Sequence, residues 1–282
     1  MKPGRRRSLL GGAVLLAAPG VALRAAGHAP AAAPTLGLDE TDPVPVWRAR
    51  FERDVTPRWT VPAAEQAGYI ERLHAALACA GHDAEQPQAL LLVDRHPQVQ
   101  AIFVLWRLPG RPWSWLGAAP VSTGQVGAFD HFRTPLGVFL HGPATPDFRA
   151  EGTFNAQGIR GYGARGLRVF DFGWVLAERG WGRGGWSPMR LQMHATDPQV
   201  LEPRLGRPAS KGCIRISTAL NRFIDRHGLL DADYEAAHAA GLRQWILRGD
   251  RETLPWPGRW LVVVDSGRNE RPDWARLEPV QA

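Results

Sequence analysis

Hydrophobic residues along the chain recur with two different periods. Residues 62–82 carry Tyr69, Leu73 and Leu77 at a spacing of four, between a proline near the start and a glycine near the end. This spacing places the three side chains on one helical face, and Pro and Gly are typical of a helix start and a helix end. The segment therefore predicts an amphipathic helix.

From residue 88 onward, the pattern changes to short apolar or alternating runs that Gly, Pro and Asp separate. The runs are QALLLVD, VQAIFVLW, WSWLGAAPVSTG, TPLGVFL, LRVFDFG, MRLQMHA, RQWILRG and RWLVVVD. Such runs are typical of β-strands joined by turns. STALNRFIDRHG and DADYEAAHAAG each begin with a capping residue and end with glycine, so they predict short helices. We expect a mostly β (α+β) fold, a β-sandwich or curled sheet with one preceding helix.

The first 27 residues differ from the rest of the chain. They combine a basic cluster, an apolar stretch and small residues suited to cleavage, which is typical of a secretory signal. The segment RRSLL loosely fits a twin-arginine signal. A retained membrane anchor is the alternative, although the apolar run is short for a membrane span. The signal predicts an exported protein, periplasmic or associated with the cell wall.

Other segments flank a main domain, predicted at residues 88–265. Residues 28–61 are rich in Ala and Pro, which predicts an extended linker without a core. Residues 62–87 form the N-terminal helical segment. Residues 266–282 predict a mobile C-terminal tail.

The formal charge of +7 is concentrated at the N-terminus. Five of the 34 basic residues lie in the first 27 positions, which contain no acidic residue, so 29 basic residues face 27 acidic ones beyond them. A nearly balanced chain lacks the basic excess that binds a phosphate backbone. We therefore expect no nucleic-acid partner.

The chain has two cysteines, Cys79 and Cys213. In an oxidising compartment such a pair can form a disulfide, which would leave a non-catalytic module. Cys79 falls in the last turn of the predicted helix, where a small buried hydrophobic side chain is the simpler interpretation.

Cys213 has a candidate base upstream. His194 lies near the end of the run MRLQMHA, nineteen positions before the cysteine. A cysteine nucleophile reacts as the thiolate, and a neighbouring imidazole or imidazolium favours its formation. A histidine at one strand end and a cysteine at another could therefore form a reactive pair.

The residues around Cys213, in PASKGCIRIS, add to this hypothesis. Gly212 permits a turn in which the N–H groups of Gly212 and Cys213 face one carbonyl oxygen, which would be an oxyanion hole. Lys211 would add positive charge beside the thiol. Arg215 lies two residues along the strand, on the same face as Cys213, and could bind a substrate carboxylate.

The segment HATDPQVLEPRLGRPASKGCIR, residues 194–215, resembles the signature of the YkuD-type L,D-transpeptidase catalytic domain, with PVSTG and TPLGVF as supporting matches. The resemblance covers roughly residues 88–217 and extends to the strand at 259–265. It implies that Cys213 is the nucleophile and that a backbone carbonyl near Ala195 orients its base, His194. Ser210 and Gly212 would shape the turn, and Arg215 would help bind substrate.

Lys211 departs from the family pattern, which usually has a second histidine at this position. A lysine cannot replace an imidazole as a donor in the same geometry, and it carries a compact permanent charge. The identity of the acceptor and the pH optimum therefore stay open. A solvated lysine without a role is the alternative interpretation.

The resemblance also implies a reaction without a metal or another cofactor. The cysteine would attack a peptidoglycan tetrapeptide stem, form a thioester and release D-alanine. Attack by another stem would give a 3-3 cross-link, and attack by an outer-membrane or wall-anchored protein would anchor that protein. Attack by water would make the protein an L,D-carboxypeptidase. Carbapenems would acylate Cys213.

Other candidate residues have simpler interpretations. His131 and His141 lack the spacing of a metal site. Asp197 could orient His194, but an aspartate before proline is typical of a turn. Trp174, Trp181 and Trp186 could form a substrate lid or a sugar platform, and core packing is the alternative for each.

Overall fold

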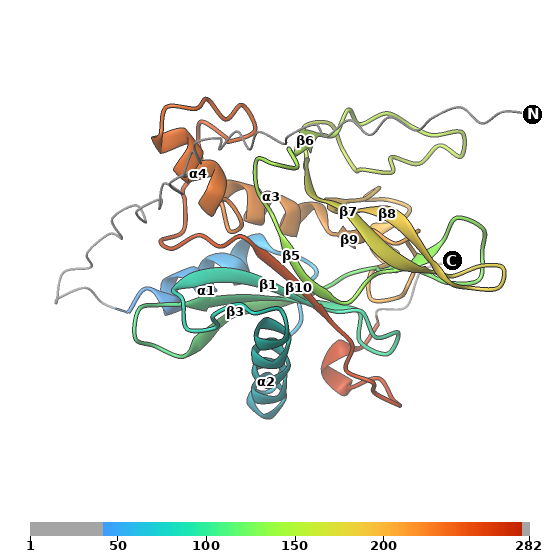
Figure 1. Ribbon diagram of the computed structural model, residues 1–282, viewed down its shortest axis with the longest axis horizontal. Coiled ribbons are helices and arrows are strands. Elements are labelled where there is room, and N and C mark those ends of the chain that lie inside the picture. The colour runs from blue at the N-terminus through green and yellow to red at the C-terminus, as the bar shows by residue number, and fades with distance from the viewer. Residues whose placement is uncertain (1–41, 278–282) are drawn as a thin grey trace, which may run out of the picture. The chain divides into compact units, whose positions relative to one another are not determined.

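Two mixed β-sheets and four α-helices make up residues 42–277, the part of the chain that the computed structural model describes (Figure 1). The predicted signal and the first part of the predicted linker lie outside the described residues. The elements are α1 (Val44–Asp54), α2 (Ala63–Cys79), β1 (Gln88–Asp94), β2 (Ala101–Arg107), β3 (Trp113–Pro120), β4 (Phe132–Arg133), β5 (Gly137–Leu140), β6 (Phe148–Arg149), β7 (Arg168–Arg179), β8 (Trp186–Ala195), β9 (Ile214–Ile216), α3 (Thr218–Arg226), α4 (Ala232–Ala239) and β10 (Trp260–Val264), with short 3-10 helices η1 (Glu202–Arg204) and η2 (Asp273–Ala275).

The first sheet has the strand order β3-β2-β1-β10-β5, and the second has the order β4-β7-β8-β9, with β6 paired to β7. Most neighbours are antiparallel. The exceptions are β1 with β10 and β8 with β9, which are parallel. The parallel pair β8–β9 positions the candidate site.

The inner faces of the two sheets share one hydrophobic core. Leu91 and Val263 of the first sheet belong to the same cluster as Phe170, Leu191 and Ile214 of the second, together with residues of α1 and α3. Burying apolar surface between two sheet faces is the main source of stability in such a layered fold. The expected α+β fold with a β-sandwich is confirmed, as are the short helices after Cys213.

Helix α2 covers the opposite face of the first sheet, as Figure 1 shows below β1 and β10. Its predicted stripe of Tyr69, Leu73 and Leu77 is almost completely buried against Leu90 and Phe103. The helix prediction is therefore confirmed, and α2 packs on the sheet instead of forming a separate segment.

Helix α1 lies where residues 28–61 predicted a linker without a core. Its side chains Val44, Trp47 and Phe51 recur at spacings of three and four and enter the main core. The two prolines at its N-terminal end suggested extended chain, but proline is tolerated in the first turn of a helix. The linker prediction is wrong for this stretch.

Two predictions near the C-terminus are also wrong. Residues 243–249 form no strand. Ile246 is the one buried side chain in this segment, so the alternating buried face of a strand is missing. Residues 266–277, predicted as part of a mobile tail, pack on the body of the fold. Trp274 contacts the rings of Tyr69 and Phe103, and Ala275 is buried.

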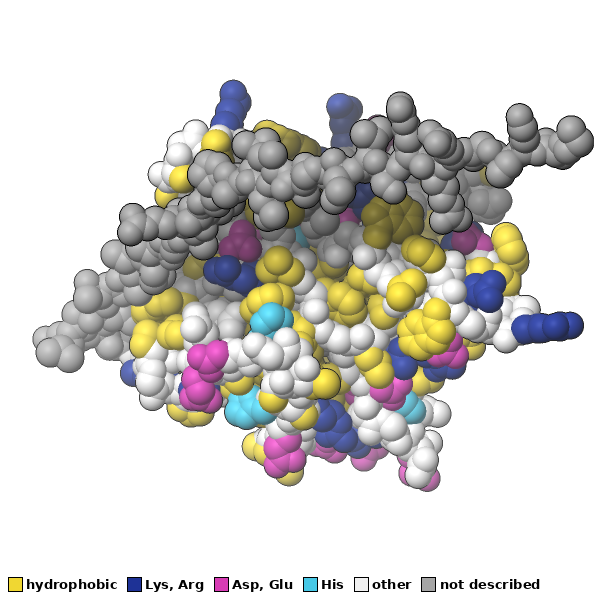
Figure 2. All heavy atoms as spheres, in the orientation of Figure 1, with side chains coloured by type: hydrophobic (Ala, Val, Ile, Leu, Met, Phe, Trp, Pro, Cys, Tyr) yellow, Lys and Arg dark blue, Asp and Glu magenta, His cyan; other side chains and the backbone are white. Residues whose placement is uncertain are grey.

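Basic and acidic side chains are interspersed over the face of the molecule drawn in Figure 2. No helix within residues 42–277 is long and apolar enough to cross a membrane.

Candidate active site

The pairing of β8 with β9 places the predicted site residues on one face of the second sheet. His194 lies directly opposite Arg215, and Cys213 immediately precedes β9. Cross-strand partners and residues two apart project from the same face, so His194, Cys213 and Arg215 share one face. The alternate residues Met193 and Ile214 enter the core. The three side chains therefore lie on the outer face of this sheet.

His194 is held in one orientation and one tautomer. Its Nδ1 lies 2.6 Å from the carbonyl oxygen of Ala195, and because a carbonyl only accepts, Nδ1 carries the proton. Nε2 is left with a free lone pair. Burial lowers the pKa of His194 to about 4, with a further contribution from the charge of Arg215. The imidazole is consequently neutral near pH 7 and can act as a base.

Cys213 is a thiol in its resting state. Its Sγ lies 3.8 Å from the carbonyl oxygen of Arg190. Burial raises the pKa of the thiol and Asp171 adds to the increase, whereas the backbone N–H of Gln192 and the charge of Arg215 lower it incompletely. An imidazolium that favours the thiolate, which the sequence suggested, is absent here, because the imidazole of His194 is neutral and provides no positive charge. Among the described residues no hydrogen bond joins Cys213 to His194.

The side chain of Lys211 pairs with Asp130. Its ammonium group is 3.2 Å from a carboxylate oxygen of Asp130, and both side chains are exposed. The charges that shift the pKa of Cys213 come from Arg215 and Asp171. The interpretation of Lys211 as a charge that activates Cys213 is therefore corrected, and a solvated lysine fits its position.

The turn before Cys213 is fixed by hydrogen bonds and by Gly212. Ser210 Oγ accepts from the Gly212 N–H at 3.0 Å and donates to the Cys213 carbonyl at 2.5 Å. Thr134 Oγ1 donates to the Gly212 carbonyl at 2.6 Å. Gly212 has φ of 134°, and a Cβ there would lie 2.9 Å from the side chain of Met189. The backbone conformation therefore favours glycine, and an added Cβ would also force the end of the Met189 side chain to shift.

The predicted oxyanion hole is only half available. Because the Gly212 N–H is donated to Ser210, it does not point at a substrate oxygen. The N–H of Cys213 has no partner within residues 42–277. It is the remaining donor of the predicted pair.

A hydrogen-bonded network beside Cys213 was missed from the sequence. Asp171, fully buried on β7, accepts from Gln192 Nε2 and Arg190 Nε, each at 2.7 Å. Gln192 Oε1 in turn accepts from the Tyr162 hydroxyl at 2.9 Å. The ring of Tyr162 lies edge-on to the His194 ring, 4.6 Å between centroids. The alternation of Arg190, Gln192 and His194 in MRLQMHA was the available signal.

The remaining polar candidates have structural partners. Arg215 Nη1 donates to the carbonyl of Ala209 at 2.7 Å, which holds the guanidinium beside the site. Asp197 accepts from the N–H groups of Arg160, Gln199 and Val200, so it caps a turn and does not orient His194.

Neither histidine considered for a metal belongs to a metal-like cluster. His131 Nδ1 contacts the carbonyl of Gln125, and His141 Nε2 contacts the carboxylate of Asp147 at 2.9 Å. Within the described residues there is no group of three or more His, Cys, Asp or Glu side chains that could hold a metal ion.

Both cysteines are free thiols, which removes the basis for a Cys79–Cys213 disulfide. Cys79 is exposed, contrary to the expectation of a buried residue. It lies two positions after Leu77, about 200° around the helix, and therefore outside the buried stripe.

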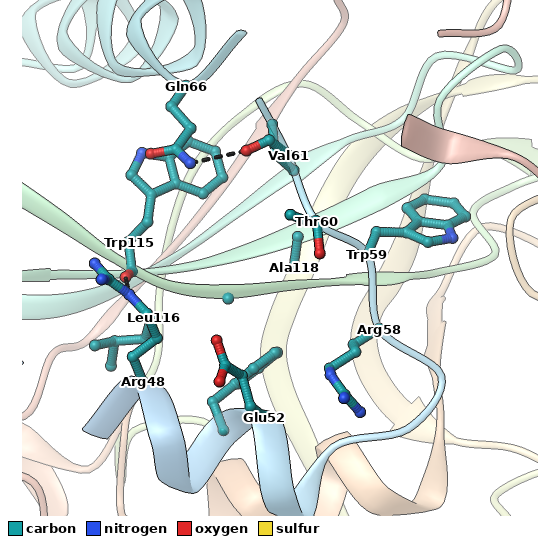
Figure 3. A pocket seen from close by; sticks show the side chains of 12 residues that line it. Arg48, Glu52, Arg58, Trp59, Thr60, Val61, Gln66, Trp115, Leu116 and Ala118 are labelled. Carbon is teal, nitrogen blue, oxygen red and sulfur yellow. Dashed lines mark hydrogen bonds between the residues drawn. The ribbon is translucent and has the colours of Figure 1, made fainter. Parts of the chain in front are cut away.

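A cavity lined by residues of α1, α2 and β3 lies apart from this chemistry. It encloses about 240 Å³ and is lined by Arg48, Glu52, Arg58, Gln66 and Trp115 among others (Figure 3). Neither cysteine nor histidine lines it, so it offers no nucleophile or imidazole base.

Comparison with known proteins gives little beyond this geometry. No family model and no curated protein matches the chain. The solved structures that align with it include the following two. One is a fused Zn-dependent amidase/peptidase/peptidoglycan-binding domain-containing protein from Clostridium acetobutylicum ATCC 824, with 13% identity over 73% of this chain and 64% of that chain and a TM-score of 0.27. The other is Bd1075 of Bdellovibrio bacteriovorus, with 11% identity over 64% and 48% and a TM-score of 0.30.

This chain therefore spans less than two thirds of the length of either aligned structure. TM-scores this low assign neither fold nor activity.

Proposed function

We propose that the protein is a cysteine acyltransferase of the L,D-transpeptidase type that acts on peptidoglycan stem peptides outside the cytoplasm. The observation that carries the proposal is the placement of Cys213, His194 and Arg215 on one face of the second sheet. The Nδ1–H of His194, bonded to Ala195, leaves Nε2 free as a base. The sequence resemblance around Cys213 supplies the substrate class.

The first step forms a thioester. His194 Nε2 takes the proton of the Cys213 thiol as Sγ attacks the carbonyl carbon between the third stem residue and the terminal D-alanine. The N–H of Cys213 stabilises the resulting oxyanion. Protonated His194 then donates its proton to the departing amine, so the C–N bond breaks and D-alanine leaves.

The second step transfers the acyl group. An acceptor amine or water attacks the thioester, His194 takes one proton from that acceptor, and the proton returns to the Cys213 sulfur as the C–S bond breaks. Arg215 is half-buried beside the thiol, and its charge suits a substrate carboxylate. A stem peptide, a wall-anchored protein or water could each be the acceptor in this scheme.

The proposal is tested by mass spectrometry of the products after incubation with a purified disaccharide tetrapeptide. The comparison uses the unmodified protein, Cys213→Ala and, as a matched control, Cys79→Ala, because Cys79 is the other free cysteine. We expect cross-linked dimers lacking one D-alanine from the unmodified protein and from Cys79→Ala only.

Other products would change the assignment. Tripeptide without dimer would identify water as the acceptor and make the protein an L,D-carboxypeptidase. Equal turnover by Cys213→Ala would exclude a cysteine mechanism.

A further inference from the structure

Three large apolar side chains are exposed on the outer face of the β7–β8 hairpin. Trp174, Leu176 and Trp186 have exposed fractions of 71%, 65% and 68%. Ala177 and Met189, at alternate positions of the same two strands, face the core. We call these three exposed residues the hairpin stripe. A row of such side chains on a soluble surface is characteristic of an interaction site.

The hairpin stripe is continuous with the candidate active site. Trp174 lies directly opposite Arg190, and the carbonyl oxygen of Arg190 is 3.8 Å from Cys213 Sγ. Trp186 lies opposite Glu178, four residues along β7 from Trp174, or about 14 Å. The stripe thus begins one cross-strand position from Arg190, whose carbonyl contacts the nucleophile, and runs away from it.

The end of the stripe near the site also carries hydrogen-bond donors. Arg190 Nε is bound to Asp171, and the Arg190 side chain is 45% exposed. Its terminal nitrogens have no partner among the residues that the structure describes. A ligand on the stripe would therefore meet two indole rings and a guanidinium that can donate to hydroxyl or carbonyl oxygens.

A glycan fits this combination better than a protein surface. The faces of pyranose rings present C–H groups that stack on indole rings, while their hydroxyl groups accept hydrogen bonds from a guanidinium. The stripe is narrow and bordered by the charged residues Glu178 and Arg190, whereas a protein interface needs a broad patch with an apolar centre. Trp181, the third tryptophan of this region, instead packs on Phe132 at 4.8 Å.

We propose that the hairpin stripe binds the glycan portion of the substrate, so that the sugar and the stem peptide of one molecule occupy the same sheet face. This inference rests on the proposed function for the identity of the substrate. Binding energy from the distant sugar would then hold the stem peptide at Cys213.

The test compares kcat/KM for a free tetrapeptide and for the same tetrapeptide carrying its disaccharide. We expect the unmodified protein to prefer the disaccharide substrate and the double variant Trp174→Ala/Trp186→Ala to lose about tenfold of that preference. The matched control is Trp245→Ala, because Trp245 is 63% exposed but lies outside the strands of both sheets. It should keep the preference.

A second measurement separates failure of this inference from failure of the proposed function. Co-sedimentation with glycan strands stripped of their peptides requires no catalysis. Binding that the double variant loses and Trp245→Ala retains supports the inference, even if neither peptide is turned over. Absence of binding, an unchanged substrate preference, or a dimer of the protein that the double variant abolishes would overturn it.

Discussion

At the residue scale, the candidate site combines a protonated thiol with a neutral imidazole. Burial disfavours the charged form of each group, so it raises the pKa of Cys213 and lowers that of His194 to about 4. A thiolate–imidazolium pair would require both shifts in the opposite directions. Cys213 should therefore become nucleophilic only as His194 removes its proton during attack.

The pH dependence of Cys213 alkylation tests this state. A raised pKa leaves less thiolate at a given pH, so in the Cys79→Ser variant the rate of labelling by iodoacetamide should keep rising above the ordinary thiol pKa of 9.0. Peptide mass spectrometry over a series of pH values measures this rate. A rate that is already maximal at neutral pH would reveal a resting thiolate and contradict this description.

Gly212→Ala tests the turn that presents the thiol. The added Cβ would meet Met189 at 2.9 Å and would occupy a backbone conformation with φ of 134°. We expect a loss of about 1–3 kcal/mol in the free energy of unfolding, measured with urea, and loss of turnover. Gly249→Ala is the matched control, because Gly249 has open space and an ordinary φ. Equal effects of the two variants would argue against a special role for Gly212.

At the element scale, the sequence predicted those helices and strands that their own segments specify through hydrophobic period, composition or capping residues. Helix α2 and strand β1 follow from period and composition, and α3 begins where Ser217 accepts from the Leu220 N–H. Helix α1 was not predicted because its prolines suggested extended chain, and the apolar run at residues 243–249 wrongly suggested a strand. The motif at Cys213 indicated His194 and Arg215. The partners of Asp171 depended on the register of β7 against β8, which no local pattern contains.

Phe51→Ala tests whether α1 is part of the main core. Phe51 is 1% exposed and lies so close to Gly117 that a Cβ there would overlap its ring. Its removal should cost about 3–5 kcal/mol of unfolding free energy. Val46→Ala, on the same helix but 54% exposed, should cost far less. Similar urea midpoints for the two variants would mean that α1 behaves as a linker.

At the scale of the whole molecule, contacts between distant segments set the architecture. Strand β1 pairs in parallel with β10, far along the chain, and the second sheet is tied to the helices by a buried charge network. Arg168 is fully buried and bonds to Asp147 and Asp231, with Asp225 nearby. Such pairings follow from the tertiary fold and could not be predicted from the sequence of either partner alone.

Arg168→Met tests this network. The substitution removes the buried cation that Asp147 and Asp231 share and leaves Asp147 with His141 alone, which should cost about 3–5 kcal/mol in urea unfolding. Arg226→Met is the control, because Arg226 forms an exposed ion pair with Glu252 and its loss should change the midpoint little. A small effect of Arg168→Met would show that the network does not contribute to stability.

The central claim, that Cys213 carries the acyl group, is tested most directly by intact-protein mass spectrometry shortly after mixing Cys79→Ala protein with a tetrapeptide stem. We expect a mass increase equal to the peptide without its terminal D-alanine, located by peptide mapping on Cys213 and absent when Cys213 is also replaced by Ala. A His194→Gln variant should form this adduct far more slowly, because no base removes the thiol proton. An adduct on another residue, or the same adduct in the protein without Cys213, would contradict the claim.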